Sequence, residues 1–429
     1  MNRRFAALVF VLFLISCQQA SNKAPVLSPE GSADAAGFSP ERLSRLDSGM
    51  NNWVKNKWVN GAVALVARKG KIVFHKSFGY NDPDTNEPLD KNGIFRIASQ
   101  TKAITTVAAM MLWEEGKYGL DDPVSKYIPT FANQTVIDKF NLKDTTYTTV
   151  PAKRPITIRD ILTHTSGIGY AGIGTPEANA LYAKNRITGG VGLKTTEKIG
   201  DAMTRLGSVP LLFQPGEKWM YGVNTDLLGY LVEIWSGMTL EQYFTEKIFK
   251  PLGMNDTYFN VPQEKASRLV NFFMDSDGSG IKKQDVVWGA LDMKFPVTPH
   301  SYFSGGGGLS STITDYAILL QMLLNEGEYN GKRYLARNTV RLMTTNQIGD
   351  LFSTGENKFG FGFAITTENS SRLTPSQAGT YAWGGAFSTT YWVDPKEQML
   401  VLLYRQMWGP HIADTDRQFK PLVYQALND

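Results

Sequence analysis

Apolar and polar positions alternate near both ends of the chain and recur at helical spacing in its middle. AVALVARKGKIVFHKSFGY, from Ala62 to Tyr80, indicates two strands joined at RKGK as an antiparallel hairpin. Near the other end, YAWGGAFSTTYWVD and QMLVLLYRQ indicate two further strands joined at DPKE. Between them, runs such as TDLLGYLVEIWSG have the spacing of helices that stop at Gly or Pro. The pattern predicts an α/β (α+β) fold whose antiparallel sheet is built from both chain ends, flanked by helices, with a large, mainly helical insertion.

The ends of the folded part are marked by helix signals. Ser39 can cap, and Pro40 can open, a helix that runs to about Lys55, and DTDRQFKPLVYQALND closes the chain as a helix. We therefore expect one domain over 39–429, with a sheet lobe at about 39–98 and 305–429 and a helical lobe at about 99–304. A ligand cleft is expected where the two lobes meet.

One pair of side chains lies at that junction. In FRIASQTKAITT, Ser99 stands three residues before Lys102, so one helical turn separates them and both can share a face. A serine cap followed by a surface lysine is the simpler interpretation. However, the following run AITTVAAMMLWEEG has apolar residues on most faces of the helix it would form, which predicts a central, buried helix. A lysine at the start of such a helix needs a reason, because burying an ammonium is costly.

A serine hydroxyl is a weak nucleophile until a base removes its proton. None of the four histidines stands in a familiar nucleophile context, no G-x-S-x-G elbow occurs, and His164 in LTHTSG is interpreted as structural packing. A lysine base aided by a tyrosine is the alternative. Tyr221, in PGEKWMYGVNTDLLGYLVE, follows a Pro-Gly turn and opens a helical run, although a tyrosine there is often only packing.

Two glycine-containing runs point toward the same cleft. Gly384 and Gly385 follow Trp383 at the start of a predicted strand, where glycines mark a bulge or the close approach of a ligand or another backbone. SGGGG, at 304–308, lacks the G-K-[ST] of a phosphate-binding loop and is interpreted as close-packed backbone near the cleft.

Taken together and in this order, S-Q-T-K, Y-G-V and W-G-G resemble the three motifs of the serine β-lactamase and penicillin-binding-protein superfamily. The resemblance is closest to its class C-like branch, which includes the family VIII carboxylesterases, and it covers about 39–429. The runs ITIRDILTHTSGI, QPGEKWMYG, PLGMNDT and SGGGGLSSTITDY also look typical of that branch. A β-lactamase/transpeptidase-like fold is therefore expected.

The resemblance implies a role for each matching position. Ser99 would be the nucleophile that forms an acyl-enzyme, and Lys102 and Tyr221 would share the general-base and general-acid work. The oxyanion hole would use the backbone N–H groups of Ser99 and Ala386. The positions that would contact substrate are Val223, Trp383, Gly384 and Gly385.

This sequence departs from the β-lactamase pattern at two positions. Val223 stands where class C β-lactamases have an asparagine, and Asn224, one residue later, would be rotated away on a helix. Trp383 replaces the lysine of K-T-G. The resemblance implies that both lost side chains hold polar parts of a β-lactam, which an ester with an apolar acyl or alcohol part does not need. Ester hydrolysis is therefore the predicted reaction.

The N-terminus has the form of a bacterial lipoprotein leader. Arg3 and Arg4 precede an apolar run from Phe5 to Ile15, too short to span a bilayer, which ends in LISC at Cys17. LISC resembles the lipobox, whose cysteine is lipidated. We expect a signal peptide at 1–17, a flexible polar tether at 18–38, and a lipid-anchored protein of the cell envelope, periplasmic or on the outer surface. A plain signal peptide with an incidental cysteine is the alternative.

Charge and composition exclude several other classes. The net charge is +4, or +2 without Arg3 and Arg4, which leaves no nucleic-acid footprint. Cys17 is the only cysteine, and no histidine cluster suggests zinc, so neither a metal nor a cofactor is expected. The predicted function is serine hydrolysis of a small ester. A β-lactamase or D-alanyl-D-alanine carboxypeptidase, and a catalytically silent binding protein of the same fold, remain open, as does the oligomeric state.

Overall fold

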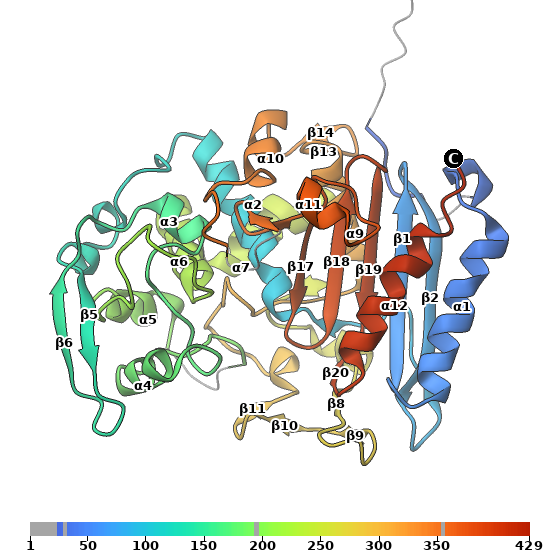
Figure 1. Cartoon of the computed structure of the whole chain (residues 1–429), viewed down its shortest axis with the longest axis horizontal. Coiled ribbons are helices and arrows are strands. Elements are labelled where there is room, and N and C mark those ends of the chain that lie inside the picture. The colour runs from blue at the N-terminus through green and yellow to red at the C-terminus, as the bar shows by residue number, and fades with distance from the viewer. Residues whose placement is uncertain (1–23, 29–31, 193–196, 353–356) are drawn as a thin grey trace, which may run out of the picture.

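A computed structural model describes residues 24–28, 32–192, 197–352 and 357–429, and its centre is an eight-stranded sheet (Figure 1). The strand order is β15-β16-β17-β18-β19-β1-β2-β3, and every neighbouring pair is antiparallel. Along the chain, the strands are β1 (Gly61–Arg68), β2 (Lys71–Asp82), β3 (Glu87–Pro88), β15 (Lys358–Phe359), β16 (Ala364–Ile365), β17 (Tyr381–Gly385), β18 (Thr389–Asp394) and β19 (Met399–Tyr404).

The two ends of the chain meet in the middle of this sheet. β1 pairs with β19 from Val63 opposite Tyr404 to Arg68 opposite Met399. The hairpin turn between β1 and β2 lies at RKGK, and the turn between β18 and β19 lies at DPKE. The predicted α/β class, with a sheet assembled from both ends, is confirmed.

Alternation along β1 separates two hydrophobic cores. Val63 and Leu65 enter the core shared with the helical lobe, whereas Ala64 and Val66 face the core under the terminal helices. Those helices are α1 (Pro40–Lys55), capped by Ser39 as predicted, and α12 (Ile412–Tyr424), and they pack side by side (Figure 1). All eight residues of β1 are buried, as expected for a strand covered on both faces.

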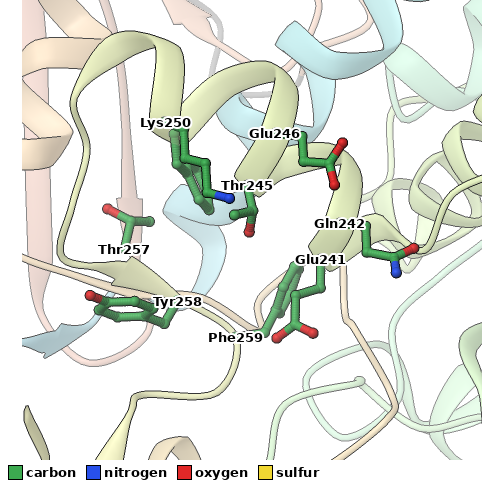
Figure 2. Close-up of a pocket in the computed structure, with 9 residues that line it drawn as sticks. Glu241, Gln242, Thr245, Glu246, Lys250, Thr257, Tyr258 and Phe259 are labelled. Carbon is green, nitrogen blue, oxygen red and sulfur yellow. The ribbon is translucent and has the colours of Figure 1, made fainter. Parts of the chain in front are cut away.

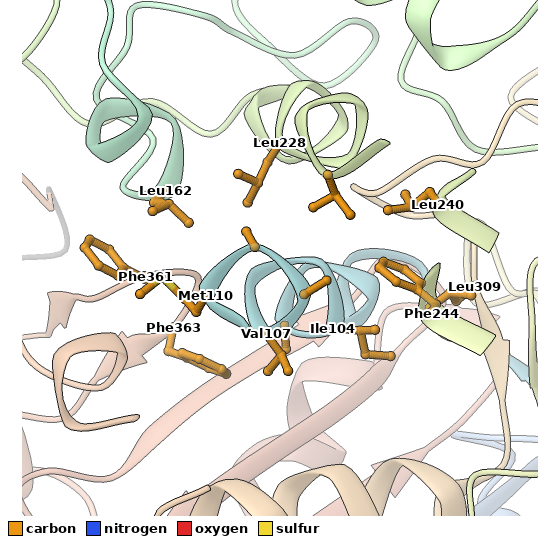
Figure 3. Packing of buried hydrophobic residues seen from close by; sticks show 14 of the residues in the cluster. Ile104, Val107, Met110, Leu162, Leu228, Leu240, Phe244, Leu309, Phe361 and Phe363 are labelled. Carbon is orange, nitrogen blue, oxygen red and sulfur yellow. The ribbon is translucent and has the colours of Figure 1, made fainter. Parts of the chain in front are cut away.

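Helix α2 (Thr101–Glu114) runs through the larger core, between the sheet and the insertion. Every residue from Thr101 to Met110 is buried, so the helix is enclosed on all sides. Leu162 and Leu228 lie on one side of it and Phe363 on the other (Figure 3). α9 (Ile313–Leu324) contributes to the same core and packs against β19 and β1. The buried central helix predicted after Ser99 is confirmed.

The insertion is less helical than its sequence suggested. Its helices are α3 (Ile158–Leu162), α4 (Pro176–Lys184), α5 (Ile199–Leu206), α6 (Asn224–Ser236), α7 (Leu240–Tyr243), a π-helical turn (Phe244–Phe249) and α8 (Lys250–Leu252). It also carries a hairpin of β5 (Thr135–Phe140) and β6 (Tyr147–Pro151), whose Thr-, Val- and Tyr-rich runs favour strands. ITIRDILTHTSGI stops being helical after Leu162, because His164 takes a left-handed φ of 58°.

Short elements complete the fold around this framework. They are β4 (Phe95–Arg96), β7 (Thr257–Tyr258), β8 (Phe273–Met274), β9 (Lys282–Lys283), β10 (Val286–Val287), β11 (Leu291–Asp292), β12 (Ser310–Ser311), β13 (Glu328–Tyr329), β14 (Lys332–Arg333), α10 (Arg337–Met343), α11 (Glu368–Ser371) and β20 (Met407–Trp408). In the part of the chain that the structure describes, no helix is both long and apolar enough to cross a membrane.

Candidate active site

Ser99 lies on a sharp turn between β4 and α2. Ala98, directly before it, has a φ of 42°, a left-handed conformation that alanine rarely adopts. The chain then makes one 3₁₀ turn (Ala98–Gln100) and continues into α2 at Thr101. This turn leaves Ser99 half-buried at the start of the central helix. The sequence contained no signal for the left-handed conformation of Ala98.

Ser99 opens onto a cavity of about 460 Å³. Ala386, the other predicted donor of the oxyanion hole, lines the same cavity although it lies almost 300 positions further along the chain. The remaining lining is mostly apolar or backbone and consists of Ala98, Tyr170, Ala171, Gly172, Ile173, Gly189, Gly190, Val191, Trp288 and Phe387. The structure therefore brings the two predicted oxyanion positions to one apolar cavity.

Lys102 lies behind Ser99, outside the lining of this cavity, and only 2% of its surface is exposed. Its Nζ donates hydrogen bonds to Ser99 Oγ at 3.4 Å and to the carbonyl oxygen of Gly306 at 2.6 Å. The same nitrogen lies 4.6 Å from the ring centre of Tyr221 and 5.5 Å from that of Tyr170, where it gains cation–π attraction. The buried ammonium is thus compensated by a carbonyl and two aromatic faces, and it is aimed at the serine.

Tyr221 comes from the distant segment before α6 and closes the other side of the lysine. Its ring packs against Tyr170 at 5.4 Å and Trp383 at 5.6 Å between centroids. Its buried hydroxyl finds no hydrogen-bond partner among the described residues. An unpaired buried hydroxyl is costly, so its retention suits a group that bonds to substrate or to a reacting atom. Ser99 and the Tyr221 ring thus both lie beside the Lys102 amine.

The W-G-G motif forms the end of β17, next to the turn that carries Ser99. A Cβ at Gly385 would lie 2.2 Å from the carbonyl oxygen of Ile97, so only glycine allows this approach. Trp383 is half-buried, and the three residues of the motif lie just outside the cavity lining, which begins with Ala386. The predicted close approach of another backbone is therefore present, and it places Ala386 beside Ser99.

Val223 does not reach the cavity. It is 0% exposed in the core, where its amide bonds to the carbonyl of Gly169, so its side chain offers no surface to a substrate and the predicted contact is corrected. Val223 immediately precedes α6, and that position points it into the helical packing. Asn224 is also buried; its amide bonds to His164 and its Oδ1 accepts from Ser166, so it is turned away from the cavity as expected.

His164 is a packing residue, as its sequence context suggested. Burial, followed by the charge of Lys102, lowers the pKa of its imidazole to about 3. Its Nδ1 lies 3.0 Å from the Asn224 amide, which donates to it, and its ring packs 5.2 Å from that of Tyr221. A neutral, buried imidazole with this pKa is a poor base at neutral pH, so it does not compete with Lys102.

Sequence reasoning missed three residues of this region. Tyr170 and Trp288 line the cavity, and Asp226 is a fully buried carboxyl behind Gly190, which also lines it. Asp226 had a usable signal, since it is an acidic residue inside the apolar run TDLLGYLVEIW. Trp288 had none, because it lies in the turn between the two-residue strands β10 and β11, which are too short to show a periodicity.

A second pocket, of about 240 Å³, lies between α7, the π-helical turn, α8 and β7 (Figure 2). Its walls carry charges of both signs, including Glu241, Glu246 and Lys250. None of the predicted catalytic or substrate residues lines it. Among the residues that the structure describes, no cluster of three or more His, Cys, Asp or Glu side chains is placed to hold a metal ion.

The family follows from a direct comparison. A family profile described as Beta-lactamase matches residues 46–423. The chain belongs to the beta-lactamase family. It is 29% identical to Esterase EstB of Burkholderia gladioli, covering 88% of this chain and 96% of that protein. It is 28% identical to a putative D-alanyl-D-alanine carboxypeptidase of Escherichia coli K12, covering 97% and 93%.

A solved structure extends the comparison to three dimensions. EstCE1, described as a hydrolase with promiscuous acyltransferase activity, superposes with a TM-score of 0.76 at 25% identity, over 90% of this chain and 99% of that one. The predicted superfamily and fold are confirmed. The protein is a serine hydrolase of this superfamily.

Proposed function

We propose that the protein hydrolyses carboxylic esters through an acyl-enzyme on Ser99. One observation carries the proposal: the buried amine of Lys102 lies 3.4 Å from the hydroxyl oxygen of Ser99, which lines an apolar cavity. Nucleophile and base within hydrogen-bond reach are the signature of covalent catalysis. The cavity, at about 460 Å³, has the size of a small-molecule site.

The reaction follows from this arrangement. The Ser99 oxygen bonds to the ester carbonyl carbon while its proton passes to neutral Lys102 Nζ, directly or through the Tyr221 hydroxyl. The tetrahedral intermediate then breaks its bond to the alcohol oxygen, which takes that proton and leaves as an alcohol. Water adds to the acyl-enzyme by the same proton path and releases the carboxylic acid and free Ser99.

The negative oxygen of the intermediate needs donors aimed at it. Ser99 and Ala386 line the same cavity, and the glycine contact between Gly385 and Ile97 holds their backbones together. We assign the two N–H groups as the oxyanion hole. Ser99 belongs to the first turn of a helical segment, where backbone N–H groups lack helical partners.

An ester is favoured over a β-lactam by the residues in and around the cavity. Trp383 occupies the position of the β-lactamase lysine, and Val223 is buried, so neither supplies a polar handle. Tyr170, Ile173 and Trp288 instead present apolar surface to the acyl or alcohol part. The similarity to proteins named as an esterase and as a hydrolase with acyltransferase activity supports this choice.

The test is a substrate panel on protein truncated before residue 24. Short p-nitrophenyl esters, nitrocefin and a D-Ala-D-Ala peptide would be compared, with Ser99→Ala as the inactive control. We expect turnover of the esters, and labelling by a fluorophosphonate probe at Ser99 located by mass spectrometry. Labelling of another serine, such as Ser166 or Ser310, would refute the assignment of the nucleophile.

Cleavage of D-Ala-D-Ala peptides is the second candidate, because the chain is similar to a putative carboxypeptidase over nearly its whole length. Faster turnover of the peptide than of any ester in the panel would establish this alternative. The same serine, lysine and tyrosine would then act on an amide instead of an ester.

We also propose that Cys17 carries a lipid that holds the protein at the cell envelope. Cys17 lies outside the described residues, so the support is the LISC motif after a short apolar run. Wild-type protein should partition with membranes, and Cys17→Ser should be released or left unprocessed. Soluble wild-type protein cleaved at another residue would exclude the anchor.

A further inference from the structure

Asp226 is a carboxyl sealed inside the protein close to the catalytic lysine. It belongs to the first turn of α6 and is 0% exposed. Its Oδ1 accepts a hydrogen bond from Ser304 Oγ at 2.6 Å and a longer one from the Gly306 amide at 3.4 Å. Its Oδ2 has no hydrogen-bond partner among the described residues. A buried carboxyl with an unsatisfied oxygen is costly, so its presence requires an explanation.

The glycine-rich loop, residues 304–308, joins this carboxyl to Lys102. Gly306 donates its N–H to Asp226, and its own carbonyl accepts the 2.6 Å hydrogen bond from Lys102 Nζ. One residue therefore connects the carboxyl to the base. The adjacent Gly305 carbonyl accepts from Thr105, one turn beyond Lys102 on α2. The loop is thus bonded to α2 on one side and to α6 on the other.

Glycines make room for the carboxyl on two sides. A Cβ at Gly306 would lie 2.4 Å from Asp226 Oδ2, and a Cβ at Gly190 would lie 2.8 Å from Oδ1. Both contacts are shorter than any side-chain carbon tolerates. Gly190 also lines the cavity. The carboxyl therefore occupies a fitted recess directly behind the cavity wall.

Lys102 is the cation whose charge acts on the Asp226 carboxyl. Burial is the largest influence and raises the pKa of the Asp226 carboxyl, while the Ser304 hydroxyl, Lys102 and the Gly306 amide oppose that rise. The phenols of Tyr170 and Tyr302 also act on it; burial raises the pKa of both well above the usual value, so they stay neutral.

We propose that Asp226 is a positioning residue for Lys102, an inference that rests on the proposed function. Through Gly306 it holds the carbonyl that aims the amine at Ser99. Its negative charge balances the ammonium that forms when Lys102 takes the serine proton. The geometry joins four groups in series: Asp226, Gly306, Lys102 and Ser99.

Asp226→Asn tests the charge while keeping the shape and the acceptor oxygen. We expect kcat on a p-nitrophenyl ester to fall about tenfold to a hundredfold, with KM little changed, because the bound substrate does not touch Asp226. The acidic limb of the kcat/KM profile should move to lower pH, because removing the carboxylate charge disfavours the protonated form of the base. A purely structural role would not move that limb.

Asp315→Asn is the matched control. Asp315 is also a buried carboxyl in the first turn of a helix, bonded to Thr257 and to the Asp256 amide, and burial raises its pKa to about 6. Among the described residues, none of its hydrogen bonds reaches the glycine-rich loop or Lys102. This variant should lose thermal stability and keep the wild-type pH limb.

Two outcomes would overturn the proposal. One is an Asp226→Asn profile with its acidic limb at the wild-type pH, as in Asp315→Asn. The other applies if Asp226→Asn does not fold: Ser304→Ala, which removes one bond to the carboxyl, should then lower kcat severalfold, and an unchanged kcat would refute the link. Neither outcome affects the labelling of Ser99, so failure here is distinguishable from failure of the proposed function.

Discussion

The floor and the mouth of the cavity depart from ordinary protein surfaces in opposite ways. Lys102 and Asp226 lie behind the cavity wall, in the region that we call the floor, and are ionisable groups with almost no exposure. At the mouth, Ile173 is 62% exposed and Trp288 is 57% exposed. Charged groups normally lie in water and large apolar ones inside, so each reversal marks a functional part. The floor is arranged for proton transfer, and the mouth for contact with an apolar substrate.

The two parts are also held differently. The floor is fixed by hydrogen bonds to backbone, such as that from Lys102 to Gly306. Trp288 is held by ring contacts, with Trp408 at 4.9 Å and Phe387 at 6.0 Å between centroids. Displacing a hydrogen-bonded base should therefore stop the reaction, whereas trimming the mouth should change which substrates bind.

The largest effect is expected from the floor. Lys102→Ala should lower kcat on the order of a thousandfold or more, and Tyr221→Phe nearly as much, because each fixes the position and charge state of the other. The double variant should lose little beyond either single change, since both act on one proton. Steady-state kinetics on the three variants measure this. Additive losses, or a nearly wild-type Tyr221→Phe, would leave Tyr221 as a packing residue.

A slightly smaller loss of kcat is expected where β17 contacts the turn that carries Ser99. Gly385→Ala would push its Cβ against the Ile97 carbonyl at 2.2 Å and move the Ala386 amide away from the oxyanion. The kcat should fall by about a hundredfold to a thousandfold, as for the loss of one donor. Gly384→Ala meets its nearest atom at 3.0 Å and should cost clearly less. Equal losses in the two variants would argue against the assigned oxyanion hole.

The buried imidazole of His164 should make the free energy of unfolding depend on pH. The folded chain holds the pKa of His164 at about 3, whereas an imidazole in the unfolded chain has its ordinary pKa of 6.5. Between these two values only the unfolded state takes up the proton. The contribution of His164 to the free energy of unfolding is therefore fully present above pH 6.5 and is lost toward pH 3, by about 1.4 kcal/mol per pH unit.

His164→Asn keeps a residue that tolerates the left-handed backbone and should flatten this dependence, at some cost in stability at neutral pH. Urea midpoints measured between pH 4 and 7 compare the two proteins. A slope identical to that of wild type would show that other groups dominate the acid sensitivity.

The smallest effect is expected at the mouth. Trp288→Ala should raise KM for esters with a long acyl chain by about threefold to tenfold, because part of their apolar surface stays in water. It should leave kcat and the turnover of acetate esters almost unchanged. Leu373→Ala is the matched control, since Leu373 is 71% exposed and lies outside the cavity lining. A fall in kcat with Trp288→Ala would mean that the mouth also positions the floor.

The sequence was sufficient for features that rest on local patterns. The β1–β2 and β18–β19 hairpins, the Ser39 cap and the buried helix after Ser99 follow from alternation, capping and apolar spacing over a few residues. The pairing of Ser99 with Lys102 was predictable for the same reason, because one helical turn sets their separation.

Other features were beyond the reach of those patterns. The β5–β6 hairpin was missed in a region predicted to be mainly helical. Its composition favours strands, but both strands are short and together hold only one buried residue, so they show no alternation of buried apolar positions. The burial of Val223 depends on how α6 packs, which no spacing reveals. The conformation of Ala98 is set by the strand and helix on either side of it, because alanine alone does not favour a positive φ.

The sequence by itself determined which groups could react: a serine one turn before a lysine, a tyrosine before a helix and glycines in a strand. Only the tertiary structure decided that these groups meet. It brought Tyr221 over Lys102, placed Ala386 beside Ser99 and set Asp226 behind Gly306. The physical reason is that periodicity acts over a few residues, whereas the charge and position of a buried group depend on neighbours that are distant in the chain.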